Sequence, residues 1–262
     1  TLVNQVVKTG QFDGLIAYAA RKLRQARPDI SDHDLVIELA FLVNAKLALS
    51  LVQRFGAHVS VELHPDLGYD VHRTLAFARR YYDINPTHFY VKVPLTPDGY
   101  ISARILSDEG VPINFTLGFS ARQNYLAARL SHPRFVNVFL GRLNSLVEEN
   151  DMGNPENIGE KATLASFEAV EGVRKSQIGV FTFQIAASLR SGDQVAKLAG
   201  VDVLTMPPTV ADEYLALDIP KDEVRQRTSE ELHVELDESR PVEADEIRRL
   251  WDERIEGLIR EA

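Results

Sequence analysis

A lysine stands in the middle of a short apolar run, FYVKVPL at positions 89–95. The residues around Lys92 are those of a buried strand, and TPDG follows them with turn chemistry. Lysine is rarely buried, because an unpaired ammonium in a dry site is costly or loses its proton. A neutral amine can attack a carbonyl carbon to form an imine. The pattern therefore predicts a functional Lys92, and a lysine that reaches solvent from an edge strand is the alternative.

Polar side chains also stand near the ends of two other predicted strands. Glu62 follows the apolar residues of VSVEL, which indicates a proton-transfer group or an ion pair with a basic neighbour. Asn114 and Thr116 alternate along INFT, so they face the same side of that strand. Direct substrate contact and a simple hydrogen-bonded layer explain these two residues almost equally well.

Three further candidates belong to the later strands. Asn137 lies within FVNVF, Arg142 follows that strand, and Arg190 follows TFQIAAS. Taken singly, each arginine is typical of a solvent-exposed side chain. Two arginines at one end of a sheet predict a bidentate clamp for phosphate.

Strand and helix patterns alternate along most of the chain. The predicted strands are residues 58–63, 88–95, 112–119, 134–141, 182–188 and 201–208. The predicted helices are residues 35–55, 69–82, 100–110, 120–131, 159–177 and 192–200, the first of them capped by Ser31 and Gly56. Strands that alternate with helices form right-handed βαβ units and a parallel sheet. The Gly-rich phosphate loops of doubly wound sheets are missing, which favours a (β/α)₈ barrel.

Composition excludes several classes of protein. The 262 residues contain no cysteine, so disulfides and thiolate chemistry are excluded, and the formal net charge of −9 argues against a nucleic-acid partner. His58, His64, His72 and His88 show no metal-ligand spacing, so no metal is expected. No apolar run approaches the length of a membrane span and no signal peptide opens the chain, so we expect a cytoplasmic protein without a membrane partner.

Four sequence blocks, in order, resemble the transaldolase family. They are VKVPLTPDG at 91–99, INFTLGFS at 113–120, NVFLGRLNS at 137–145, and IAASLRSGDQVAKLAGVDVLTMPP at 185–208. The resemblance covers roughly residues 59 to 208 and is weaker before and after. It implies a class I, Schiff-base (β/α)₈ TIM barrel that needs no cofactor.

The resemblance also implies roles for the candidate residues. Lys92 corresponds to the imine-forming nucleophile, Glu62 to an acid/base that works through a bound water, and Thr116 to a residue that holds this water. The implied substrate-binding residues are Asn114, Asn137, Phe139, Arg142 and Arg190, of which the two arginines bind phosphate. The family generally has serine where Asn137 stands, which puts the donor preference in doubt, whereas Phe139 favours transfer over simple cleavage.

The implied reaction is transfer of a dihydroxyacetone unit in the pentose phosphate pathway. The donor is fructose 6-phosphate or sedoheptulose 7-phosphate, and the acceptor is an aldose phosphate. Two alternatives stay open. One is an aldolase like fructose-6-phosphate aldolase, in which dihydroxyacetone is released, and the other is a non-catalytic sugar-phosphate-binding relative.

The two ends of the chain carry separate expectations. TLVNQVVKTG resembles the residues that follow the family's second strand, so strands one and two, with their aspartate and asparagine, are expected to be missing. We expect an incomplete barrel domain over residues 1–216 and a charged segment over 217–262 whose terminal helix packs on the barrel. A separate N-terminal segment that completes the barrel, and a homo-oligomer, both stay open.

Overall fold

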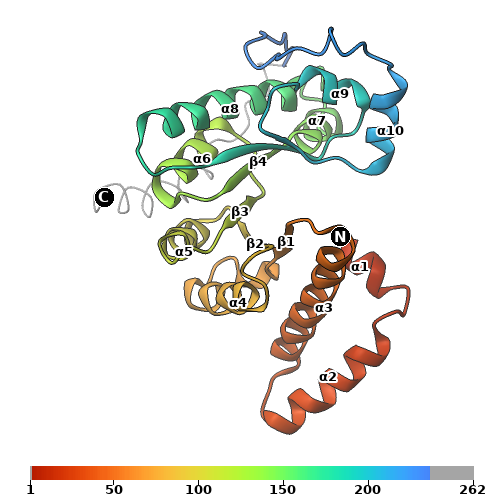
Figure 1. The fold of residues 1–262 in the computed structure, drawn as a ribbon, viewed down its shortest axis with the longest axis vertical. Helices are drawn as coiled ribbons and strands as arrows, with labels where there is room; N and C mark the ends of the chain where they lie inside the picture. Colours follow the sequence, from red (N-terminus) through yellow and green to blue (C-terminus); the bar gives the residue numbers. More distant parts are fainter. Residues whose placement is uncertain (1, 237–262) are drawn as a thin grey trace.

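The computed structural model describes residues 2–236, and the chain begins with three helices (Figure 1). They are α1 (Leu2–Val7), α2 (Asp13–Ala26) and α3 (Asp32–Phe55). Helix α3 begins where the Ser31 hydroxyl accepts a hydrogen bond from the Asp34 amide at 3.0 Å. It ends at Gly56, whose φ of 61° is left-handed. Both predicted caps of this helix are confirmed.

Six parallel strands form one sheet whose spatial order follows the sequence. They are β1 (Val59–Glu62), β2 (Phe89–Pro94), β3 (Ile113–Thr116), β4 (Phe135–Phe139), β5 (Phe183–Ala187) and β6 (Val203–Leu204). The connecting elements are η1 (Pro65–Leu67), α4 (Val71–Ile84), α5 (Pro97–Asp108), α6 (Ala121–Leu126), the π-helical turn η2 (Ala127–Ser131), α7 (Leu140–Glu149), α8 (Ile158–Ser176), α9 (Gly192–Lys197) and α10 (Pro208–Ala216). The six predicted strands are therefore confirmed.

The sheet curls, and the apolar side chains of its strands face the helices. Helix α3 packs on β1, α4 and α5 pack on β2, and α8 packs on β4 and β5. Val61, Val91, Val93 and Phe115 are fully buried in this layer, and their neighbours in sequence point to the opposite, inner face. This confirms the α/β class. Within residues 2–236 neither β1 nor β6 has a second strand beside it, so the closed eight-stranded barrel and its two missing strands stay predictions.

The sequence patterns missed or displaced several helices. Pro97, Asp98 and Gly99, read as a turn, form the first turn of α5, where the Thr96 hydroxyl accepts a hydrogen bond from the Gly99 amide at 3.0 Å. Helix α7 begins at the residue after β4, so the apolar run of the strand hides its start. The sequence patterns predict none of the helices α1, α2, α7 and α10.

Helix α3 is 24 residues long with a mean hydropathy of 2.0 in its most apolar window, so its length and composition would suffice to cross a membrane. This corrects the expectation that no apolar run approaches that length. In the fold, α3 buries Ile37, Phe41 and other apolar side chains in the main core. Its Glu38 pairs with Arg80 at 2.7 Å. Burial alone would raise the pKa of Glu38, but the Arg80 hydrogen bonds hold that pKa below its ordinary value.

After α10 the chain runs back along the later helices. The Arg227 amide donates to the Ala199 carbonyl at 2.7 Å, and Leu236 forms an antiparallel bridge with Gly153. The predicted terminal helix lies outside the described residues. The division at residue 216 stays a prediction.

Candidate active site

Three of the predicted site residues lie side by side on the inner face of the sheet. Strand register pairs Glu62 of β1 with Lys92 of β2, and Lys92 with Asn114 of β3. Glu62 is the last residue of β1, and Lys92 and Asn114 each lie two residues before the last residue of their strands. Parallel α/β folds place functional groups at this end of the sheet. Neighbouring strands therefore bring an amine, a carboxylate and an amide to one place.

Lys92 is less buried than its sequence context suggested. Its side chain is 23% exposed, because it points to the open inner face rather than to the helix layer. The Nζ atom lies 3.7 Å from Oε2 of Glu62, whose side chain is 48% exposed. The sequence pattern indicates an ion pair with a basic neighbour as the alternative to a proton-transfer role for Glu62, and Lys92 is that neighbour. The same Lys92–Glu62 contact is therefore compatible with an ion pair and with the predicted acid/base role of Glu62.

A hydrogen-bonded row of polar side chains flanks this amine. Asn114 donates from Nδ2 to the Ser60 hydroxyl at 2.9 Å, and Asn137 donates from Nδ2 to Oδ1 of Asn114 at 3.3 Å. Asn137 also donates to the carbonyl of Phe115. Both asparagines are buried, whereas Oδ1 of Asn137 has no partner among the described residues. The row fixes the plane of the Asn114 amide next to Lys92.

Thr116 and Phe139 complete the same face. Thr116 is buried two residues beyond Asn114, in register with Pro94 of the lysine strand. The ring of Phe139 lies 5.9 Å from Nζ of Lys92 and 6.1 Å from the ring of Phe119. An aromatic face at this distance attracts a cation and shields one side of the amine from water.

Arg142 and Arg190 lie close together because the backbone at Gly141 packs tightly against the end of β5. Arg142 lies in the first turn of α7 and Arg190 follows β5, and both are exposed. A methyl group on Gly141 would stand 2.2 Å from the Ser188 carbonyl and 2.9 Å from Nε of Arg190. The Arg190 side chain therefore passes over the residue next to Arg142. Neither arginine forms an ion pair within residues 2–236, which leaves both guanidinium groups available to an anion.

Sequence reasoning missed two residues that support the site. Ser60 lies two positions before Glu62, so strand alternation alone would have placed it on the same face. Asn124 of α6 is fully buried and donates from Nδ2 to the Asn137 carbonyl at 3.1 Å and to the Ser166 hydroxyl at 2.8 Å. An asparagine inside the helix pattern was its only signal. Within the described part of the chain, no three His, Asp or Glu side chains converge as metal ligands would.

Comparison with known proteins identifies the class to which this fold and site belong. The family model described as transaldolase/fructose-6-phosphate aldolase matches residues 1–254. The chain therefore belongs to the transaldolase/fructose-6-phosphate aldolase family, a family of α/β enzymes.

Two individual proteins that are similar to this chain are named probable transaldolases. The chain is 35% identical over 127 residues to a probable transaldolase of Nitrosopumilus maritimus, which is 48% of this chain and 51% of that protein. It is 39% identical over 123 residues to a probable transaldolase of Parvibaculum lavamentivorans, which is 46% of this chain and 50% of that protein. The chain thus spans about half the length of the curated relatives it matches.

Proposed function

We propose that this protein transfers a dihydroxyacetone unit between sugar phosphates through an imine on Lys92. The observation that carries the proposal is the register of Glu62, Lys92 and Asn114, with Nζ of the lysine 3.7 Å from the glutamate. A reactive amine needs a nearby group that accepts and returns protons, and a carboxylate at this distance can do so directly or through one water.

The proposed reaction begins when neutral Nζ of Lys92 attacks the ketone carbon of a ketose phosphate such as fructose 6-phosphate. The carbonyl oxygen leaves as water after proton transfer by Glu62, and a protonated imine forms. Cleavage of the bond between C3 and C4 sends its electron pair into the imine and gives an enamine. The Glu62 carboxylate, which gave up its proton during imine formation, accepts the proton of the C4 hydroxyl through a water, and an aldehyde phosphate departs. The enamine carbon then attacks the aldehyde carbon of an aldose phosphate, and water releases the new ketose.

The other residues of the site hold the substrate in this proposal. Asn114 contacts a donor hydroxyl, and Thr116 helps to hold the water used by Glu62. Arg142 and Arg190 bind the phosphate, and their exposure together with the lack of acidic partners among residues 2–236 supports this role. Asn137 is tied to Asn114 and Phe115, so we assign it to the orientation of Asn114.

We further propose that two additional strands close the sheet into a (β/α)₈ barrel. In the described residues β1 and β6 each expose one edge, and exposed edges of a curled sheet are generally covered in stable proteins. The added strands come from a preceding segment of the same protein or from a separate chain. Either source would bring further polar groups to the same end of the barrel.

Borohydride trapping tests the imine. The protein is incubated with fructose 6-phosphate, reduced, digested and analysed by mass spectrometry. We expect a reduced dihydroxyacetone adduct on Lys92 and no adduct in Lys92→Met. An adduct on another lysine, or an equal yield in the variant, would refute the assignment.

The same incubation separates transfer from simple cleavage. Erythrose 4-phosphate is added and the products are measured. We expect a seven-carbon ketose phosphate to form faster than free dihydroxyacetone. Release of dihydroxyacetone at an unchanged rate would instead favour an aldolase, in which a proton rather than an aldehyde captures the enamine.

A further inference from the structure

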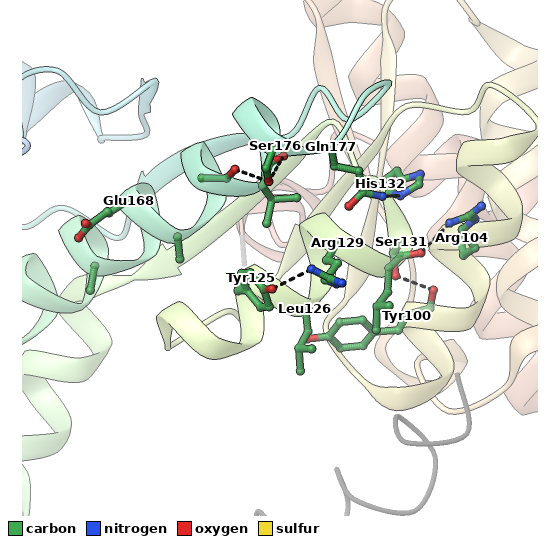
Figure 2. A pocket seen from close by; sticks show the side chains of 15 residues that line it. Tyr100, Arg104, Tyr125, Leu126, Arg129, Ser131, His132, Glu168, Ser176 and Gln177 are labelled. Atoms are coloured by element: carbon green, nitrogen blue, oxygen red, sulfur yellow. Dashed lines mark hydrogen bonds between the residues drawn. The ribbon is translucent and has the colours of Figure 1, made fainter. Parts of the chain in front are cut away.

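A groove lies on the helical side of the fold, away from the inner face that carries Lys92. It has a volume of about 1480 Å³ and is bounded by α5, by α6 with η2, and by the second half of α8 (Figure 2). Its floor includes Leu126 and Leu130 on one side and Ala169 and Val173 on the other. The small side chains of α8 leave room for another helix to approach.

The rim of this groove is mainly basic. Arg104 enters from α5 and Arg129 from η2, and Figure 2 shows both at its edge. Arg129 donates to the Tyr125 hydroxyl at 3.1 Å and forms no ion pair within residues 2–236, whereas Arg104 pairs with Asp108 at 2.9 Å. Glu168 is the acidic residue among those that line the groove. The guanidinium of Arg129 is therefore available to a carboxylate of a docked segment.

The described chain ends beside the start of α8, the helix whose second half forms one wall of this groove. Leu236 is bridged to Gly153, and the Asn157 side chain donates to the His233 carbonyl at 3.4 Å, immediately before α8 begins at Ile158. A helix rises about 1.5 Å per residue, so Val173 lies about 22 Å further along α8. Ten extended residues span up to about 33 Å. Residues 237–246 are thus long enough to carry the following segment to the groove.

The sequence after Leu236 contains apolar and acidic residues that suit the apolar floor and the arginines of this groove. Residues 237–262 contain nine acidic and five basic residues. Ile247, Leu250, Trp251, Ile255 and Leu258 recur at helical spacing, which predicts one apolar stripe among charged positions. Residues 247–259, which carry this stripe, hold three acidic and three basic residues. The apolar stripe therefore complements the apolar floor, and single carboxylates of the segment can pair with a guanidinium on the rim.

We propose that residues 247–259 of the same chain dock as an amphipathic helix in the groove between α5, η2 and α8. Trp251 and its apolar neighbours pack on Leu126, Leu130 and Ala169, and the acidic residues face Arg129. The inference does not depend on the proposed reaction. The docked helix ties the end of the chain to the outside of the sheet, opposite the face that carries the site.

Engineered cysteines test this contact, because the natural chain has none. Ala169→Cys combined with Ile255→Cys should oxidise to an intramolecular disulfide, at a rate independent of protein concentration. The matched control is Glu171→Cys with Ile255→Cys, since residue 171 lies on α8 but does not line the groove. A disulfide-linked dimer would indicate docking on a second copy. A dimer, or equal rates in the two pairs, would overturn the proposal.

The single tryptophan gives an independent measurement in the full chain. In the folded protein, Trp251 should emit at shorter wavelength than in the unfolded protein, and iodide should quench it weakly. Ala169→Arg should shift the emission toward that of the unfolded protein, whereas Ala17→Arg, at an exposed position of α2, should leave it unchanged. Exposed-type emission from the unmodified protein would overturn the proposal even if a variant failed to fold.

Discussion

The two ends of the sheet's inner face differ in how their side chains are used. At the carboxyl end, the Lys92 and Glu62 side chains are partly exposed and lie 3.7 Å apart. At the amino end, an aromatic row joins His58, which precedes β1, to one ring from each of β2, β4 and β5. The His58 and Tyr90 rings are 5.1 Å apart, those of Tyr90 and Phe135 are 5.3 Å apart, and those of Phe135 and Phe183 are 6.4 Å apart. One end presents charges to solvent, and the other end packs rings against each other.

Two arginines reinforce the amino end. Arg134 and Arg174 each lie 4.5 Å from the centre of the Phe183 ring. Arg174 also pairs with Asp202 at 3.1 Å and donates to the Thr182 carbonyl at 2.9 Å. The arginines at the carboxyl end have no such partners within residues 2–236. The comparison indicates that the arginines at the amino end are tied into the fold, whereas Arg142 and Arg190 at the carboxyl end form no ion pair within residues 2–236.

The largest expected effect is a difference in stability between a variant at the amino end of the sheet and a variant at its carboxyl end. Phe183→Ala removes a ring that contacts Phe135 and two arginines, and we expect a loss of about 2–4 kcal/mol in the free energy of unfolding. Lys92→Met removes only a partly exposed ion pair, worth about 0–1 kcal/mol, yet should abolish imine formation. Urea denaturation of both variants measures the difference.

Phe181→Ala is the matched control for this comparison. Phe181 lies two residues before Phe183 but is 65% exposed, so its removal should change the free energy of unfolding by at most a few tenths of a kcal/mol. Equal losses for Phe181→Ala and Phe183→Ala would contradict the stabilising role of the aromatic row.

A smaller effect is expected at the carboxyl end from Gly141→Ala. The added methyl would meet the Ser188 carbonyl at 2.2 Å and the Arg190 side chain at 2.9 Å. We expect a loss of about 1–3 kcal/mol in stability, together with weaker binding of inorganic phosphate because Arg190 is displaced. Thermal unfolding and a phosphate titration measure the two effects.

Gly14→Ala is the control, because a methyl there meets nothing within 4 Å. It should be at least as stable as the unmodified protein. A Gly141→Ala variant with unchanged stability would contradict the close approach of the β4 and β5 ends.

The smallest expected effect is a pH dependence at the amino end, where His132 precedes β4. Burial, followed by the charge of Arg104, lowers the pKa of His132 below its ordinary value. The unfolded chain therefore binds a proton more readily, and stability is lost as the pH falls through about 6.5, the ordinary histidine pKa. The free energy of unfolding should fall less between pH 7 and pH 5 in His132→Asn, which retains a residue tolerant of the φ of 49°. An equal loss of stability in the unmodified protein and in His132→Asn would show that His132 is not the source of the pH dependence.

Particular residues show how far the sequence could predict the fold and the site. Alternation identified Asn114 and Thr116 as one face of their strand, because side chains of a strand alternate whatever surrounds them. Helix α7 was missed because Leu140 continues the apolar run of β4 and Gly141 indicates a turn rather than the first turn of a helix. Arg142 was thus expected in a loop and lies in a helix.

The sequence by itself determined the order of the six strands, the caps of α3 and the identity of the candidate residues, because these depend on local periodicity and residue type. Only the tertiary structure decided that Lys92 faces the open side of the sheet beside Glu62, that Gly141 brings Arg190 next to Arg142, and that Asn137 is bound to its neighbours. These contacts join residues far apart in the chain. They depend on strand register and on close backbone approach, which a local pattern does not contain.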